Sequence, residues 1–478
     1  MAVPVVEQGL YEIRRKIYPR AVTGHFATAR WVLVLLTQIV FYGLAWLPWN
    51  GRQAVLFDLA ARKFYIFGLV FWPQDIVYLT VILIVCAYSL FLFTALAGRL
   101  WCGYACPQTV YTELFLWIER WIEGDRLARM KLDRGPLTPV KLGRKLSKHS
   151  VWVALSLWTG FTFVGYFTPI RSLCAEVLAL STGPWETFWM LFYGFATYGN
   201  AGWMREQVCK YMCPYARFQG VMFDPDTLVI TYDHNRGEPR GSRSRGTDPA
   251  SQGLGACVDC GICVQVCPTG IDIRNGLQYE CIGCAACIDG CNQVMDRMGY
   301  PRGLIRYSTE NALARGLDRR ATLRRVFRPR VLLYMGILVA VASAALLTLA
   351  HRSPVKVDVM RDRVPMSADR ADGRVDNVYR LQIMNTDETR RAFTMSVSGM
   401  AEVALETRDN PVVLAGATSR VVPVRVSARA GSGEHGSFPI EFRVQAVATD
   451  GPSPGLEVVE KARFVIPGQP TVERRKER

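Results

Sequence analysis

The sequence predicts an α-helical membrane protein with five transmembrane helices, a cysteine-rich domain before the last helix, and a C-terminal β-sandwich. Half of the 478 residues are apolar, and the mean hydropathy of +0.11 is high for a soluble protein. All but two of the 14 cysteines fall in short-spaced groups, and the last 187 residues contain none. From Pro354 onward, short stretches rich in Val, Phe and Tyr alternate with turn residues.

Five apolar runs without charged residues are predicted to cross the bilayer. They are residues 31–49, 76–98, 150–170, 187–204 and 331–350. The fourth run carries several tyrosines and glycines, so we expect it to be packed inside a helix bundle. A shorter aromatic run, residues 64–72, cannot span and is predicted to be interfacial or re-entrant.

The distribution of basic residues predicts the orientation. Residues 99–148 hold ten Lys and Arg and residues 302–330 hold nine, whereas the loops 51–75 and 171–186 hold three and one. Positive-inside reasoning therefore places the N-terminus and residues 205–330 in the cytoplasm, and the C-terminus on the far side. The cysteines agree, since the cysteine-rich domain then lies in the reducing compartment. If one run were a buried core helix, the C-terminal domain would change sides.

The cysteine run from Cys257 to Cys291 has the spacing C-x2-C-x2-C-x3-C twice. Bacterial ferredoxins use this spacing to hold two 4Fe–4S clusters, and the fourth cysteine of each run ligates the other cluster. We therefore expect one cluster on Cys257, Cys260, Cys263 and Cys291, and the other on Cys281, Cys284, Cys287 and Cys267. Zinc ribbons or disulfides are the alternatives, but zinc sites take two pairs of ligands rather than two runs of four. The domain is predicted to carry electrons.

A second cysteine motif, C-x-Y-x-C-P, occurs twice. Its cysteines are Cys102 and Cys106 after the second run and Cys209 and Cys213 after the fourth, offset by the same 107 residues. The proline disfavours helical backbone at the cysteine before it, so each motif should end a helix. Thiolates are soft ligands that favour Cu(I), zinc or iron–sulfur clusters. A copper site, a third cluster held by all four cysteines and a structural zinc site all remain open at this point.

These features predict five segments. They are a cytoplasmic N-terminal segment (1–30), a four-helix membrane domain (31–220), a cytoplasmic dicluster domain (221–330), a fifth transmembrane helix (331–350) and a periplasmic β-domain (355–478). In the last segment, apolar and polar residues alternate with period two in 380–384 and 441–447, which indicates an immunoglobulin-like β-sandwich in the architectural sense only.

The net charge of +16 is concentrated beside the apolar runs, so it is better explained by membrane orientation than by nucleic-acid binding. We expect no nucleic-acid partner. No G-x-G-x-x-G follows a predicted strand, so the sequence carries no nicotinamide or flavin fingerprint.

The assembled features resemble the cytochrome c oxidase accessory protein family (CcoG, FixG, RdxA) over nearly the whole chain. The resemblance rests on KFYIFGLVFWPQD at 63–75, WCGYACPQTVYTE at 101–113, CKYMCPYARFQ at 209–219 and RGEPRG at 236–241, together with the cysteine run and the thiol-free β-domain. More distant resemblance extends to the NapH- and NosR-like polyferredoxin membrane subunits.

The resemblance implies a multi-pass protein of the bacterial inner membrane that acts as a cupric reductase in assembly of a cbb-type haem–copper oxidase. Copper is then the substrate or a bound ion, and Cys102, Cys106, Cys209 and Cys213 are the copper-handling and catalytic thiols. The expected partners are the lipid bilayer, a cytosolic electron donor, copper chaperones or transporters, oxidase assembly factors and a second copy of the chain. A quinol-linked electron-transfer subunit and a non-enzymatic assembly scaffold are the alternative functions.

Overall fold

The computed structural model describes residues 16–362, 374–429, 436–447 and 456–466. Parts of the predicted N-terminal segment and β-domain, residues 1–15 and 467–478, lie outside these ranges. The chain divides into two compact units, each described below by itself. The first comprises residues 1–47 and 77–344, and the second comprises residues 48–76 and 345–478.

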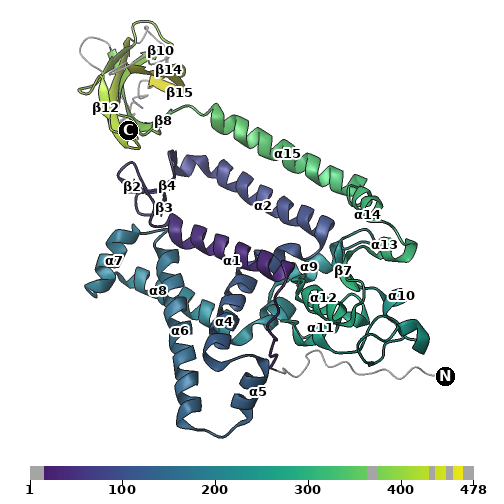
Figure 1. Cartoon of the computed structure of the whole chain (residues 1–478). Helices are drawn as coiled ribbons and strands as arrows, with labels where there is room; N and C mark the ends of the chain where they lie inside the picture. Colours follow the sequence, from purple (N-terminus) through teal and green to yellow (C-terminus); the bar gives the residue numbers. More distant parts are fainter. Residues whose placement is uncertain (1–15, 363–373, 430–435, 448–455, 467–478) are drawn as a thin grey trace, which may run out of the picture. The chain divides into compact units, whose positions relative to one another are not determined.

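Three helices among the described residues are long and apolar enough to cross a membrane (Figure 1). They are α1 (His25–Leu44), α2 (Ile76–Ala97) and α15 (Pro329–Ala350), which correspond to the predicted spans 31–49, 76–98 and 331–350. The predicted spans 150–170 and 187–204 fall on α6 (Pro139–Val164) and on α8 (Pro184–Thr197) with its π-helical continuation η2 (Tyr198–Met204). The first turns of α6 carry four Lys and Arg, so only its second half is apolar. That these two segments cross the membrane stays a prediction.

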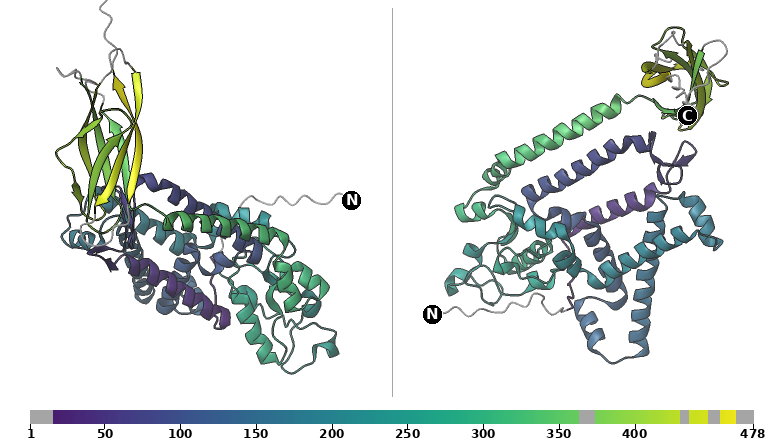
Figure 2. Two further views of the ribbon diagram at one scale, coloured as in Figure 1. Left: turned by 90° about the horizontal axis from the view of Figure 1, so that it is seen from above. Right: turned by 180° about the vertical axis from the view of Figure 1, so that it is seen from behind.

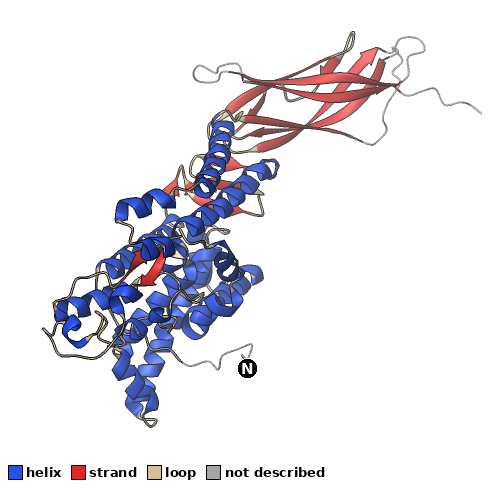
Figure 3. Ribbon diagram, turned by 90° about the vertical axis from the view of Figure 1, so that its right-hand side faces the viewer, coloured by secondary structure: helices blue, strands red, loops and turns tan. Residues whose placement is uncertain are grey.

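Shorter helices complete the first unit (Figures 2 and 3). They are α3 (Leu100–Tyr104), α4 (Pro107–Glu123), α5 (Arg126–Arg134), α7 (Ile170–Leu178), η3 (Val208–Met212), α9 (Pro214–Met222), α10 (His234–Gly237), α11 (Ile262–Gln265), α12 (Ala286–Met298), α13 (Glu310–Arg315) and α14 (Arg319–Val326).

The cysteine-rich domain is closed by a two-stranded antiparallel sheet of β6 (Val229–Tyr232) and β7 (Ile305–Ser308). It is also fastened to α1, because Asp289 of α12 accepts a hydrogen bond of 2.7 Å from the backbone N–H of Ala27. A carboxylate at a helix N-terminus satisfies orphan N–H groups and complements the helix dipole. Since Asp289 lies between Cys287 and Cys291, the start of α1 is held directly against the cysteine run.

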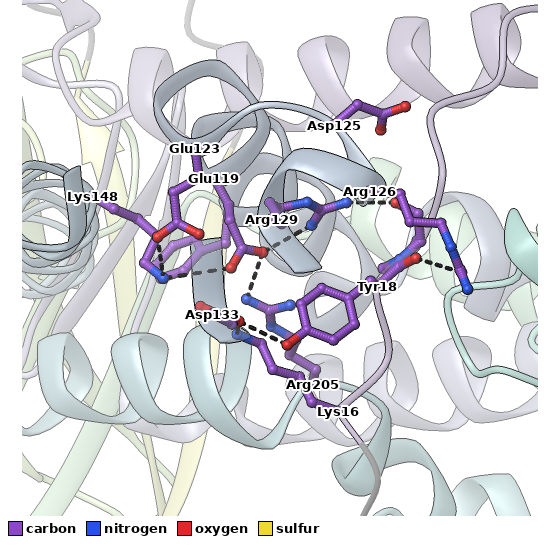
Figure 4. A network of polar contacts seen from close by, with 12 residues as sticks. Lys16, Tyr18, Glu119, Glu123, Asp125, Arg126, Arg129, Asp133, Lys148 and Arg205 are labelled. Atoms are coloured by element: carbon purple, nitrogen blue, oxygen red, sulfur yellow. Dashed lines mark hydrogen bonds and ion pairs between the residues drawn. The ribbon is translucent and has the colours of Figure 1, made fainter. Parts of the chain in front are cut away.

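A buried charge network holds α4, α5 and α6 together (Figure 4). Glu119 pairs with Arg129 at 3.1 Å, with Arg205 at 3.0 Å and with Lys148 at 3.4 Å. Burial by itself would raise the pKa of Glu119, but the three cations outweigh it and lower that pKa below its ordinary value. Because Arg205 lies just before η3, the network fixes the chain that leads into the second C-x-Y-x-C-P motif.

The second unit contains the predicted β-sandwich. Its two four-stranded antiparallel sheets have the orders β12-β10-β14-β15 and β11-β13-β9-β8. The strands are β8 (Val355–Arg361), β9 (Arg374–Asn385), β10 (Arg391–Ser398), β11 (Ala404–Glu406), β12 (Val412–Leu414), β13 (Ser419–Arg429), β14 (Gly436–Val447) and β15 (Glu457–Ile466). Inward residues of both sheets, including Leu381, Phe393, Phe442 and Phe464, form one buried core.

Residues 64–72 form strands and not the re-entrant piece that the sequence suggested as one possibility, whereas their interfacial position stays a prediction. They form β4 (Lys63–Ile66) and β5 (Leu69–Phe71), which pair with each other, and β4 also pairs with β3 (Val55–Asp58) in a three-stranded antiparallel sheet. A further pair, β1 (Pro48–Trp49) and β2 (Arg52–Gln53), precedes this sheet. The run is rich in aromatic and β-branched residues, which favour a pleated strand surface. Asp75 after this sheet pairs with Arg352 at 2.6 Å, at the start of the β-sandwich segment.

Candidate iron–sulfur and copper site

The structure gathers the eight cysteines of the run 257–291 around two cavities. The cavity of the first cysteine group is lined by Cys257, Cys260, Cys263 and Cys291, and that of the second cysteine group by Cys267, Cys281, Cys284 and Cys287. Each set contains three cysteines of one run and the fourth cysteine of the other, as the ferredoxin spacing predicts. Cys263 lines both cavities, so the two groups are immediate neighbours.

The backbone around these cysteines turns so that amide groups reach the sulfurs. Ala285 and Gly283 adopt left-handed conformations with φ of 59° and 70°, which lets the chain wrap tightly between its cysteines. Backbone N–H groups of Gly283 and Ala286 donate to the thiols of Cys281 and Cys284. Such bonds favour thiolate and tune cluster potentials. The number of cysteines, their division into two groups and the direction of the backbone N–H groups therefore fit two 4Fe–4S clusters. These eight cysteines would hold the clusters.

The two C-x-Y-x-C-P motifs break their helices where the prolines predict. Cys102 lies in α3, and Cys106 has extended backbone (φ −60°, ψ 128°) at the start of α4. Cys209 lies in η3, and Cys213 is likewise extended (φ −80°, ψ 109°) at the start of α9. Each proline occupies the first helical position, where its missing N–H costs nothing.

The four cysteines of these motifs, called here the thiol tetrad, lie close together, although the second pair follows the first by 107 residues in the sequence. The thiol of Cys209 interacts electrostatically with those of Cys106, Cys102 and Cys213. Burial, together with these neighbouring thiols, raises the pKa of Cys209 to about 12. Burial and the same kind of interaction raise the pKa of Cys102 to about 11. Without a metal, the thiols of Cys102 and Cys209 are therefore protonated near neutral pH, and a metal that binds them must displace these protons.

The thiol tetrad lies directly against the second cysteine group. Cys102 and Cys209 pack on a buried cluster that contains Ile282 and Cys284. A Cβ atom added to Gly103 would lie 2.8 Å from the backbone of Gly283, so α3 touches the cysteine loop backbone to backbone. A cavity of about 30 Å³ is lined by both Cys209 and Cys284.

Among the described residues, no three His, Cys, Asp or Glu side chains are already arranged around a single metal ion. Binding one copper ion at the thiol tetrad thus requires its thiols to move together, which cysteine achieves by rotation about χ1. The geometry leaves copper, zinc and a third cluster open as occupants of the tetrad.

Several polar residues that support the tetrad were not predicted. Gln219 is fully buried and accepts a hydrogen bond from the thiol of Cys102 at 3.4 Å. Gln108 donates to the carbonyls of Asn200 and Arg205 at 3.0 and 3.1 Å, which ties the first motif to the approach of the second. Gln108 follows Pro107 directly, whereas Gln219 lies five residues after Pro214, so the repeated motif does not mark these residues in the sequence.

The two remaining cysteines lie elsewhere. Cys86 is exposed on α2. Cys174 lies on α7 beside an apolar cluster that includes Leu173 and Phe161. Neither adjoins the tetrad or the two cysteine groups, so neither joins the site.

Comparison with known proteins identifies relatives of the whole chain. A family model described as a 4Fe-4S dicluster domain matches residues 204–310, one described as a 4Fe-4S binding domain matches residues 79–124, and one for the IG-like fold at the C-terminal of FixG matches residues 345–467. The chain is 38% identical to nitrogen fixation protein FixG of Rhizobium meliloti, covering 96% of this chain and 94% of that protein. It is also 38% identical to protein RdxA of Cereibacter sphaeroides, covering 96% and 99%. Ferredoxin-type protein NapH of Haemophilus influenzae is 24% identical over 44% of this chain and 65% of that protein.

Proposed function

Because the chain belongs to the FixG/RdxA family of iron–sulfur electron-transfer proteins, we propose that it reduces Cu(II) to Cu(I) at the thiol tetrad for assembly of a cbb-type cytochrome c oxidase. The observation that carries this proposal is the contact of Cys102 and Cys209 with the residues around Cys284. It supports short-range electron transfer from the cysteine-rich domain to an ion bound by the tetrad.

The chemistry of the donor set favours this direction of reaction. The clusters, when bound, supply one-electron transfer at potentials set by their surroundings. The tetrad offers soft thiolate ligands, which prefer Cu(I) to Cu(II) and so stabilise the reduced product. Each turnover transfers one electron to one Cu(II) ion, and a cytosolic donor then supplies a new electron. Copper chaperones or transporters and oxidase assembly factors would then receive Cu(I), and the chain would work as a monomer or as a homodimer.

We further propose a five-span arrangement in the bacterial inner membrane. In it α6 and the α8–η2 segment cross together with α1, α2 and α15, the cysteine-rich domain is cytoplasmic and the β-sandwich periplasmic. The excess of Lys and Arg in residues 99–148 and 302–330 supports this orientation. Cysteine-accessibility labelling with impermeant reagents on intact cells tests it. Labelling of a cysteine introduced into the β-sandwich, without labelling of one introduced into α5, is the expected result.

Cysteine-to-serine variants test the reductase proposal. Cys102→Ser with Cys106→Ser, or Cys209→Ser with Cys213→Ser, should abolish Cu(II) reduction by the anaerobically reduced protein. Absorbance of the clusters should remain, because the tetrad lies outside the two cysteine groups. The matched control is Cys174→Ser, which removes a thiol distant from the site and should keep full activity. Retained reduction in both double variants would remove the tetrad from the mechanism.

A cavity of about 450 Å³ favours quinol oxidation as a second candidate function. Its lining includes Trp152, Trp203, His149, Lys148 and Glu206, and its volume is in the range of small-molecule sites. Glu206 lies three residues before Cys209. Quinol oxidation by purified protein at a rate indifferent to copper chelation would favour this function over copper reduction.

A further inference from the structure

Arg99 is a buried arginine at the point where the thiol tetrad meets the second cysteine group. Only 6% of the surface of this residue is exposed. No carboxylate among the described residues lies within ion-pair distance of it, and its Nε has no hydrogen-bond partner there. A guanidinium group stays charged at any physiological pH, and a buried charge is costly unless it is paired. The structure therefore needs a negative group near Arg99 that is not a carboxylate.

The other buried arginines show that this is unusual within the chain. Arg30 lies 3.8 Å from Glu113, and Arg129 and Arg205 both pair with Glu119. Each of these cations is neutralised by an acidic side chain. Arg99 alone of the four arginines described as buried has no such partner.

Three segments that carry or adjoin the cysteines lie around Arg99. Its own backbone opens α3, which carries Cys102, and a Cβ added to Gly283 would lie 3.1 Å from its carbonyl group. Its guanidinium donates to the carbonyl oxygen of Ala216 in α9, the helix that follows Cys213. The positive charge also opposes the effect of burial on the pKa of the Cys102, Cys209 and Cys281 thiols. Both motifs and the cysteine loop thus share one cation.

The geometry points to Arg99 as the counter-charge shared by the metal-bound thiolates of the tetrad and of the second cysteine group, a positioning residue that raises the reduction potential of the second cluster. A cluster gains negative charge when it takes up an electron, so a fixed positive charge beside it stabilises the reduced form. Because the surroundings are dry, the interaction is screened less than it would be at the surface. The role toward the tetrad rests on the proposed function, whereas the role toward the cluster does not.

Redox titration of the copper-free protein, followed by electron paramagnetic resonance, tests this inference. In Arg99→Gln the midpoint potential of one cluster should fall by at least about 59 mV. For a one-electron reduction, this corresponds to a tenfold change in the equilibrium constant. The other cluster should keep its potential and serves as an internal reference, because the first cysteine group faces Arg274 rather than Arg99. Arg99→Lys keeps the charge and should stay close to the wild-type value. Arg129→Gln, which removes a buried arginine from the Glu119 network, should shift neither cluster.

Unchanged potentials in Arg99→Gln, or equal shifts of both clusters, would overturn the inference. A fall in Arg99→Lys as large as that in Arg99→Gln would also overturn it, since the effect would then come from hydrogen-bond geometry rather than charge. If Arg99→Gln takes up no clusters, Arg99→Met, which is also neutral, is measured in its place, and the same fall in the potential of one cluster is expected. Copper is absent from the titration, so a failure of the cupric reductase proposal would leave these potentials unaffected and would be recognised separately.

Discussion

The backbone contact between Gly103 and Gly283 makes a sharp prediction about electron transfer. In Gly103→Ala, the new Cβ would meet the backbone of Ile282 and Gly283 at 2.8 Å. Ordinary carbon contacts need about 3.5 Å, so α3 and the cysteine loop must separate by about 0.7 Å. Overpacking of this kind costs about 1–3 kcal/mol, which exceeds the gain of about 0.5–1 kcal/mol that alanine brings to a helix. We therefore expect a less stable protein with slower transfer to copper.

Gly143→Ala in α6 is the matched control, because nothing lies within 4 Å of a Cβ at that position. It should be as stable as wild type or more so. The assay is anaerobic single turnover, in which protein with pre-reduced clusters is mixed with Cu(II) and the rate of cluster reoxidation is followed. Thermal loss of cluster absorbance measures stability. If Gly103→Ala matches Gly143→Ala in both measurements, the tetrad does not depend on close contact with the cysteine loop and the reasoning fails.

Three further predictions concern the scaffold. Glu119→Gln leaves buried cations without their carboxylate and should cost about 3–5 kcal/mol of unfolding free energy, measured by thermal denaturation in detergent; a shift no larger than that of a surface variant would contradict it. Asp289→Ala removes the cap of α1 and should cost about 1 kcal/mol in the same assay; an unchanged melting temperature would show that the cap contributes nothing. Burial would raise the pKa of Asp133, but hydrogen bonds from Lys145, Lys16 and Tyr18 outweigh burial and lower that pKa. The ionised carboxylate therefore stabilises the folded protein at pH values above the unfolded pKa of about 3.9, and this stabilisation is lost as the pH falls below that pKa. The advantage of wild type over Asp133→Asn should therefore shrink progressively as pH falls below about 4, and a difference that stays constant down to about pH 2 would refute this.

Patterns with a short repeat could be predicted from the sequence. The spacing of Cys257 to Cys291 predicted which cysteines share a cavity, and the prolines at 107 and 214 predicted where the helices of the two motifs end. The period-two alternation in residues 380–384 and 441–447 predicted strands that the structure contains as parts of β9 and β14. Each of these signals is local, so a few residues determine the outcome.

The features that sequence reasoning missed depend on contacts between distant segments. Arg99 was counted only as a basic residue flanking an apolar run, because its burial and its lack of a carboxylate arise from packing against residues 216 and 283. Glu119 and Arg205 are 86 residues apart, and no spacing rule connects them. The strands of residues 64–72 were not predicted, because an aromatic-rich run of nine residues fits a re-entrant piece and a β-hairpin equally well, and only strand pairing distinguishes the two.

Metal and sulfide analysis of anaerobically purified protein, with and without added copper, tests the central claim most directly. Two clusters on the eight cysteines of residues 257–291 predict about eight iron atoms per chain in both samples, with copper bound only when the thiol tetrad is intact. About twelve iron atoms per chain, with no copper taken up, would assign the tetrad to a third cluster and contradict the reductase account.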